Sequence, residues 1–146
     1  MNRHKSIPIL IFALTLLILG AIVGCKSSPP PLDQDLSPTE FFQKAQEASD
    51  DGKYALATRY YEAFLVKYPD ERDRGLWARY EIALLKHKMG DDAGALSLFD
   101  ELIALYAGGP ADLPQGPRIL AEKLKAKIES KRQATPSPAT PAPATP

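Results

Sequence analysis

Apolar residues form two stripes along residues 76–89, with charged side chains in the gaps between them. At about 100° of helix per residue, one stripe consists of Leu76, Tyr80, Ala83, Leu84 and His87, and the opposite one of Ala78, Ile82, Leu85 and Met89. A helix with two opposite apolar sides must be covered twice, and this one is too short to span a membrane. We therefore expect it to be the central helix of a stack.

The chain before this segment predicts two more helices. Ser37, Pro38 and Glu40 have the pattern of a capping box with proline at the first helical position, so a helix should run from residue 38 to about 51. Gly52 is suited to the turn that follows, and a second helix should run from about residue 53 until Pro69 stops it. The apolar positions at helical spacing are Phe41, Phe42, Ala45 and Ala48, then Tyr54, Ala57, Tyr61, Phe64 and Leu65.

A shift of 38 residues superposes the chain on itself. The identical pairs are Ala45 with Ala83, Gly52 with Gly90, Ala55 with Ala93, Ala57 with Ala95 and Tyr68 with Tyr106. A fixed offset with matching chemistry indicates an internal repeat. Alanine permits close approach where two helices cross, and glycine permits the turn between them. The second unit is preceded by a longer linker, around residues 70–75.

The first unit resembles the tetratricopeptide repeat. The residues that carry the resemblance are Ala45, Gly52-Lys53-Tyr54, Ala57, Tyr61, Phe64 and Pro69. The second unit departs from the pattern at Asp92, where an aromatic residue is expected, and at Ala107, where the closing proline is expected. Over residues 38–107 the resemblance implies an all-α fold with two helix-turn-helix repeats.

A further helix is expected from Pro117 to about Arg132. Leu120, Leu124 and Ile128 form one narrow stripe among charged residues, as a helix that caps a repeat stack requires. The helical domain should therefore span residues 38–132, and the Pro/Ala/Thr-rich residues 133–146 should be a disordered tail.

The N-terminus has the pattern of a secretory signal in residues 1–24. Arg3 and Lys5 precede the uncharged residues 7–24. The run ends in Ile22-Val23-Gly24-Cys25, which resembles a bacterial lipobox. The resemblance implies cleavage before Cys25, attachment of lipid to its thiol and anchoring in a membrane. The alternative is that the 18 uncharged residues remain as a membrane helix.

Residues 25–37 then form a lipidated N-terminus and a Pro/Ser-rich tether. Two or three acyl chains anchor a protein stably where a single one exchanges. Lys26, rather than aspartate, follows the cysteine, which is similar to signals for transfer to the outer membrane. The expected location is the bacterial cell envelope, at the outer membrane facing the periplasm.

Charge and composition exclude several function classes. Residues 1–24 hold two of the 18 basic side chains and none of the 18 acidic ones, so the mature chain has a net charge of about −2 and no basic face for nucleic acid. Cys25 is the only cysteine and His87 the only histidine after residue 24. Acidic pairs at Asp50-Asp51 and Asp91-Asp92 suit helix ends. We expect no catalytic site, no metal site and no cofactor.

The expected binding site is on the first helix of each unit, because that helix lines the concave groove of tetratricopeptide proteins. The matching positions include Phe42, Gln46, Trp77, Tyr80, Leu84, His87 and Lys88. Trp77 and Tyr80 are residue types enriched at binding hot spots. The alternative is that Tyr80 and Leu84 pack against neighbouring helices, and that His87 is a packed or rim histidine.

The expected function is that of a lipid-anchored adaptor that holds a partner peptide or helix. Tyr68-Pro69 and the sequence of residues 95–106 resemble the small helical lipoproteins of the outer-membrane β-barrel assembly machinery, which have more repeats. Repeats of this kind generally need three or more units for stability. A structural lipoprotein that self-associates through its incomplete stack, or contacts the wall through its tail, is the alternative.

Overall fold

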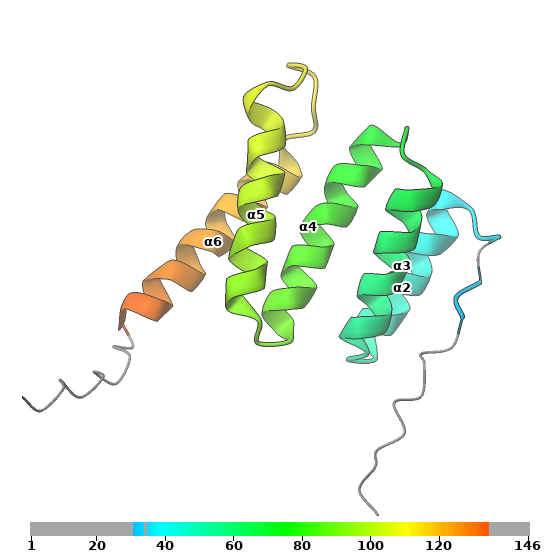
Figure 1. Cartoon of the computed structure of the whole chain (residues 1–146), viewed down its shortest axis with the longest axis horizontal. Helices are drawn as coiled ribbons and strands as arrows, with labels where there is room; N and C mark the ends of the chain where they lie inside the picture. The colour runs from blue at the N-terminus through cyan, green and yellow to red at the C-terminus, as the bar shows by residue number, and fades with distance from the viewer. Residues whose placement is uncertain (1–30, 34, 135–146) are drawn as a thin grey trace, which may run out of the picture. The chain divides into compact units, whose positions relative to one another are not determined.

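A computed structural model describes residues 31–33 and 35–134 (Figure 1). The helices are α2 (Pro38–Asp50), α3 (Tyr54–Lys67), α4 (Arg72–Lys88), α5 (Asp92–Ala107) and α6 (Gly116–Ala134). This described part of the chain contains no strand, which confirms the all-α class. The predicted signal peptide, the lipid site at Cys25 and residues 135–146 lie outside the described residues.

Helix α2 begins at the predicted capping box. The Glu40 N–H donates to Ser37 Oγ (3.4 Å), and the Ser37 N–H donates to the Glu40 carboxylate (2.7 Å). The Ser37 hydroxyl also donates to this carboxylate (2.6 Å), and the hydrogen bonds from the hydroxyl and the backbone N–H of Ser37 lower the pKa of Glu40. Helix α5 begins in a related way, because the Gly94 N–H donates to Asp91 Oδ1 (2.9 Å).

The two helix hairpins, α2–α3 and α4–α5, turn at Gly52 and Gly90. Both glycines have positive φ, 72° and 82°, a conformation that glycine adopts without strain. No other atom lies within 4 Å of where a Cβ would be at either position. The backbone conformation, rather than crowding, therefore explains why both turns use glycine.

Helix α4 is covered on two sides, as its pattern predicts. Ala78, Ile82 and Leu85 belong to a first core cluster with residues of α2 and α3. Leu76, Tyr80 and Ala83 belong to a second core cluster with residues of α5 and α6. The remaining buried members are Leu36, Phe41, Ala45, Ala48, Ala57, Tyr61 and Phe64 in the first, and Ala95, Phe99, Leu102, Leu113, Ala121 and Ile128 in the second. Met89 follows the end of the helix and is 42% exposed, so it lies outside the stripe that we assigned to it.

Positions 38 residues apart are buried alike in the two hairpins. Ala45 and Ala83, and likewise Ala57 and Ala95, are fully buried. The hydroxyls of Tyr68 and Tyr106 both donate to a backbone carbonyl outside the helices, those of Leu36 and Pro114, at 2.8 Å. The internal offset seen in the sequence thus has a counterpart in side-chain packing.

The ends of three segments differ from the prediction. Helix α4 begins at Arg72, so most of the predicted linker at residues 70–75 is helical; its first turn is charged and carried no apolar signal. Leu36 is buried in the first core cluster, so the last residues of the predicted tether pack on the domain. Helix α6 continues to Ala134, two residues beyond the predicted domain end.

The buried side of α6 is also rotated relative to the prediction. Leu120 is 38% exposed, whereas Pro117, Ala121 and Ile128 are buried. A small side chain at Ala121 permits close packing in the second core cluster. Leu124 is partly buried and lies where the predicted and observed stripes overlap.

Candidate functional site

The described residues offer no cluster of metal-ligating side chains. Within residues 31–33 and 35–134, no group of three or more His, Cys, Asp or Glu side chains could hold a metal ion. None of the helices in this part of the chain is long and apolar enough to cross a bilayer.

One side of α4 carries a stripe with the spacing i, i+4, i+7, i+11: Trp77, Glu81, Leu84 and Lys88. Three of these are predicted binding residues. The other two predicted residues of α4, Tyr80 and His87, lie on the flank that faces α5. His87 Nδ1 is 2.5 Å from Asp92 Oδ1 at the α4–α5 turn. The structure thus divides the predicted site between two flanks of one helix.

Tyr80 belongs to the core. Its side chain is 9% exposed, and its ring centroid lies 6.1 Å from that of Phe99. Burial raises the pKa of its hydroxyl. This corrects the prediction that Tyr80 lines an open surface, because a side chain so enclosed contributes to folding. Leu84 is only partly buried against the same core cluster.

Trp77 is partly covered by the start of α6. A Cβ placed on Gly116 would lie 2.8 Å from the Trp77 ring, so the backbone of α6 approaches the indole closely. The ring also contacts Tyr80 edge-on, with centroids 6.1 Å apart. One part of the Trp77 side chain therefore contacts α6, and another part is exposed to solvent.

The predicted residues of α2 contact the rest of the first hairpin. Phe42 packs edge-on against Tyr61, with ring centroids 5.2 Å apart. The exposed Gln46 side chain donates from Nε2 to the Tyr61 hydroxyl (2.6 Å). Lys88 reaches α2 from α4, where its Nζ donates to Ser49 Oγ (3.3 Å). These contacts bring α2 beside the stripe on α4.

Glu81 is the residue of this surface that the sequence analysis missed. It is partly buried, and it forms no hydrogen bond or ion pair with any residue that the structure describes. Burial raises the pKa of its carboxyl group, and the charge of Lys88 opposes the shift. The Glu81 charge in turn helps to raise the pKa of both Tyr61 and Tyr80, which places it near them. Its spacing from Trp77 and Lys88 was the available signal.

Glu81 can accept hydrogen bonds from a partner. Buried or half-buried carboxylates are normally paired, and a lysine, arginine or amide of a partner would supply the missing donor. We name this side of the molecule the first-helix surface, and it consists of Phe42, Gln46, Trp77, Glu81, Leu84 and Lys88.

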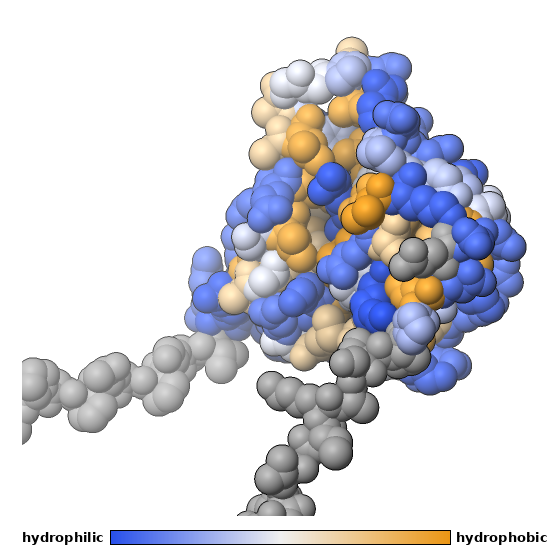
Figure 2. Space-filling model, turned by 45° about the vertical axis from the view of Figure 1, so that its right-hand side comes forward, coloured by the Kyte–Doolittle hydropathy of each residue, from blue (hydrophilic) through white to orange (hydrophobic). Residues whose placement is uncertain are grey.

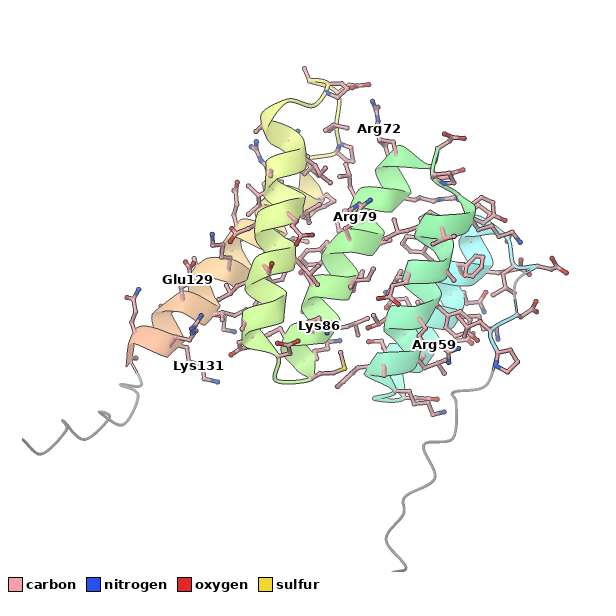
Figure 3. The ribbon with its side chains drawn as sticks, in the orientation of Figure 1. Arg59, Arg72, Arg79, Lys86, Glu129 and Lys131 are labelled. Carbon is pink, nitrogen blue, oxygen red and sulfur yellow. The ribbon has the colours of Figure 1, made fainter. Side chains whose placement is uncertain are left out.

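The opposite side of α4 faces a hollow between α3 and α5. Two adjoining cavities of about 200 and 320 Å³ share Leu65, Arg79 and Leu105 in their lining. Arg79 precedes Glu81 by two residues and so points about 200° away from it. Figure 2 shows hydrophobic surface gathered in a hollowed strip on this side of the helical unit. In Figure 3 the Arg79 side chain points out between α3 and α5.

We name this feature the second-helix hollow and define it by Leu65, Arg79, Ile82, Leu98, Glu101 and Leu105. The hollow was not predicted from the sequence. Three helices contribute to its lining, and its depth depends on how they cross. The charged side chain of Arg79 in a gap between two apolar stripes was the only local sign.

No family model, curated protein or solved structure matches this chain.

Proposed function

We propose that the chain is a lipid-anchored protein of the bacterial cell envelope that binds a partner protein through its helical unit and catalyses no reaction. In this proposal α2–α3 and α4–α5 are two tetratricopeptide-like repeats and α6 is the helix that caps them. The shared burial of Ala45 with Ala83 and of Ala57 with Ala95 supports the repeat interpretation.

The partner contacts the first-helix surface in this proposal, and Glu81 is the observation that carries it. A half-buried carboxylate without a donor lowers the stability of the fold, so a partner that supplies the donor gains more than it would at an exposed carboxylate. Trp77 offers aromatic surface beside Glu81, and Gln46 offers further hydrogen-bonding groups. The partner segment should therefore carry a basic or amide side chain.

The membrane anchor in this proposal is lipid on Cys25, and the location is the outer membrane, facing the periplasm. Radiolabelled palmitate should label the chain, and Cys25→Ser should abolish both the label and the cleavage before residue 25. Unchanged labelling of Cys25→Ser would rule out the anchor. The resemblance to lipoproteins of β-barrel assembly makes assembly of outer-membrane proteins one candidate role.

The binding proposal is tested by cross-linking in cells with Gln46→p-benzoylphenylalanine in the full-length chain. Glu81→Gln keeps the shape of the side chain and removes its charge, so it should reduce capture of the partner. Glu62→Gln removes the same charge from an exposed position on α3 and is the matched control. Equal capture by both variants would contradict a role for Glu81, and no capture at all would contradict binding at this surface.

A self-associating structural lipoprotein is the second candidate. Ile119 and Leu120 are adjacent on α6 and both partly exposed, 42% and 38%, at the end of the stack where a further repeat would pack. Light scattering of the chain without residues 1–25 should then give a dimer or larger. A monomer at the highest soluble concentration would exclude this candidate.

A further inference from the structure

We propose that the second-helix hollow is a separate docking site for a protein segment that carries an aliphatic or aromatic side chain next to a carboxylate. The apolar side chain enters the hollow, and the carboxylate pairs with Arg79. This site lies on the side of α4 opposite the first-helix surface, so the inference goes beyond the function proposed above.

Charge complementarity identifies the occupant. The other charged residues that line the two cavities have partners within the fold. Glu71 pairs with Arg74 (3.8 Å), Arg72 pairs with Asp112 (3.2 Å), and Glu101 accepts a hydrogen bond from the Ser97 hydroxyl (3.4 Å). Arg79 forms no ion pair or hydrogen bond with the residues that the structure describes. Arg79 is therefore the one cation of the hollow without a partner among the described residues, and an acidic side chain of a partner complements it on the side away from Glu101, whose hydrogen bond from the neutral Ser97 leaves its charge in place.

The apolar wall adds a second requirement. Leu65 of α3, Ile82 of α4 and Leu98 of α5 line the same cavity as Arg79 with aliphatic surface. Leu105 is 47% exposed at the rim that both cavities share. The two volumes are at or below the lower end of the about 300–1,000 Å³ usual for small-molecule sites. The hollow is therefore suited to side chains of a partner protein rather than to a whole metabolite.

Arginine suits this role better than lysine does. The guanidinium group binds a carboxylate through two parallel hydrogen bonds and is more weakly hydrated than an ammonium group. When a partner covers the hollow, water leaves the surroundings of Arg79, and the ion pair becomes stronger. The ion pair between Arg79 and the partner's carboxylate is therefore strongest when the partner's apolar side chain fills the hollow.

The experiment places a photo-cross-linker at the rim, as Leu105→p-benzoylphenylalanine, in the full-length chain in cells. The cross-linked peptide is identified by mass spectrometry. Arg79→Glu should reduce its capture by about tenfold or more. Lys131→Glu makes the same charge change on the exposed last turn of α6, distant from Arg79 in Figure 3, and should leave capture unchanged. Changing the captured carboxylate to lysine should restore capture by Arg79→Glu.

The alternative outcomes overturn the inference in distinct ways. A captured peptide without a carboxylate, or capture that survives Arg79→Glu, excludes the proposed ion pair. Capture of a second copy of this chain makes the hollow a self-association surface. Capture from Gln46→p-benzoylphenylalanine alone removes this second site and leaves the proposed function intact. Capture from Leu105 alone supports the hollow and contradicts binding at the first-helix surface.

Discussion

The two hairpins place different side chains at one equivalent position. Phe41 of α2 and Arg79 of α4 are 38 residues apart, the offset at which the sequence superposes on itself. Phe41 is 1% exposed, because Tyr68 packs edge-on against its ring (centroids 6.1 Å apart) and Leu36 joins the same cluster. Arg79 is exposed and lines the second-helix hollow.

The difference separates positions that are buried in both hairpins from a position that is exposed in the second hairpin alone. The crossing positions Ala45 and Ala83 are fully buried in both hairpins, because only small side chains allow the helices to approach. The Phe41 position is sealed in the first hairpin by the segment that precedes α2. In the second hairpin the equivalent position has no such cover, and a charged residue occupies it.

The largest expected difference in stability is between the truncation of Phe41 and the truncation of Arg79. Phe41→Ala should lower the free energy of unfolding by about 3–5 kcal/mol, because it leaves a cavity in the first core cluster. Arg79→Ala should change it by no more than about 0.5 kcal/mol, because the side chain is exposed and unpaired. Urea unfolding followed by circular dichroism gives both values.

Arg79→Leu is a control for this pair of variants. It makes the position apolar, as in the first hairpin, and should preserve stability while it removes the charge from the hollow. If Arg79→Ala destabilises the protein as much as Phe41→Ala does, the two positions are both structural, and the contrast between the hairpins fails.

Substitution of either turn glycine should cause a smaller loss of stability, and the loss should be the same at both turns. Gly52→Ala and Gly90→Ala should each cost about 1–2 kcal/mol, because alanine is strained at positive φ. The open space around each glycine excludes a steric contribution from neighbours. Thermal unfolding of the two single variants measures the loss. Gly52→Asn and Gly90→Asn should retain most of the stability, since asparagine tolerates this conformation. Unequal losses would show that the turns are not equivalent.

The smallest expected effect concerns Glu81 and pH. Burial raises the native pKa of Glu81 above the usual 4.5. At pH values between 4.5 and the native pKa, the native state therefore binds more protons than the unfolded state. Stability contributed by this group therefore falls as pH rises from 4.5 through the native pKa. Glu81→Gln should flatten this part of the curve and be at least as stable as the native protein at neutral pH.

The measurement is urea unfolding of both proteins at a series of pH values from about 4 to 8. Glu62→Gln, at an exposed position, should follow the native curve. A variant Glu81→Gln that is less stable than the native protein at neutral pH would mean that the charged carboxylate stabilises the fold.

The helices could be predicted from the sequence because their signals are local. The capping box at Ser37, the turn glycines and the two stripes of α4 each depend on residues within a few positions of one another, and the structure confirms them. The resemblance to tetratricopeptide proteins also grouped Trp77, Leu84 and Lys88 as binding positions on α4, together with Tyr80 and His87, which the structure places on the flank that faces α5.

The remaining features depend on how several helices pack. The buried side of α6 could not be fixed from its own sequence, because Leu120 and Ala121 both continue a stripe through Leu124 and Ile128. Close packing selects the smaller residue. The second-helix hollow arises where α3, α4 and α5 meet, and no single segment contains the information that defines it.

The contact between Gly116 and Trp77 gives the protein an intrinsic optical probe. Trp77 is the only tryptophan, and the first residue of α6 lies against its ring. Its emission spectrum should therefore change when the start of α6 separates from α4, as well as when the core around Tyr80 unfolds. A red shift of the Trp77 emission at a lower denaturant concentration than the loss of helical circular dichroism would show that α6 detaches before the hairpins unfold. The tryptophan would detect that step without an added label.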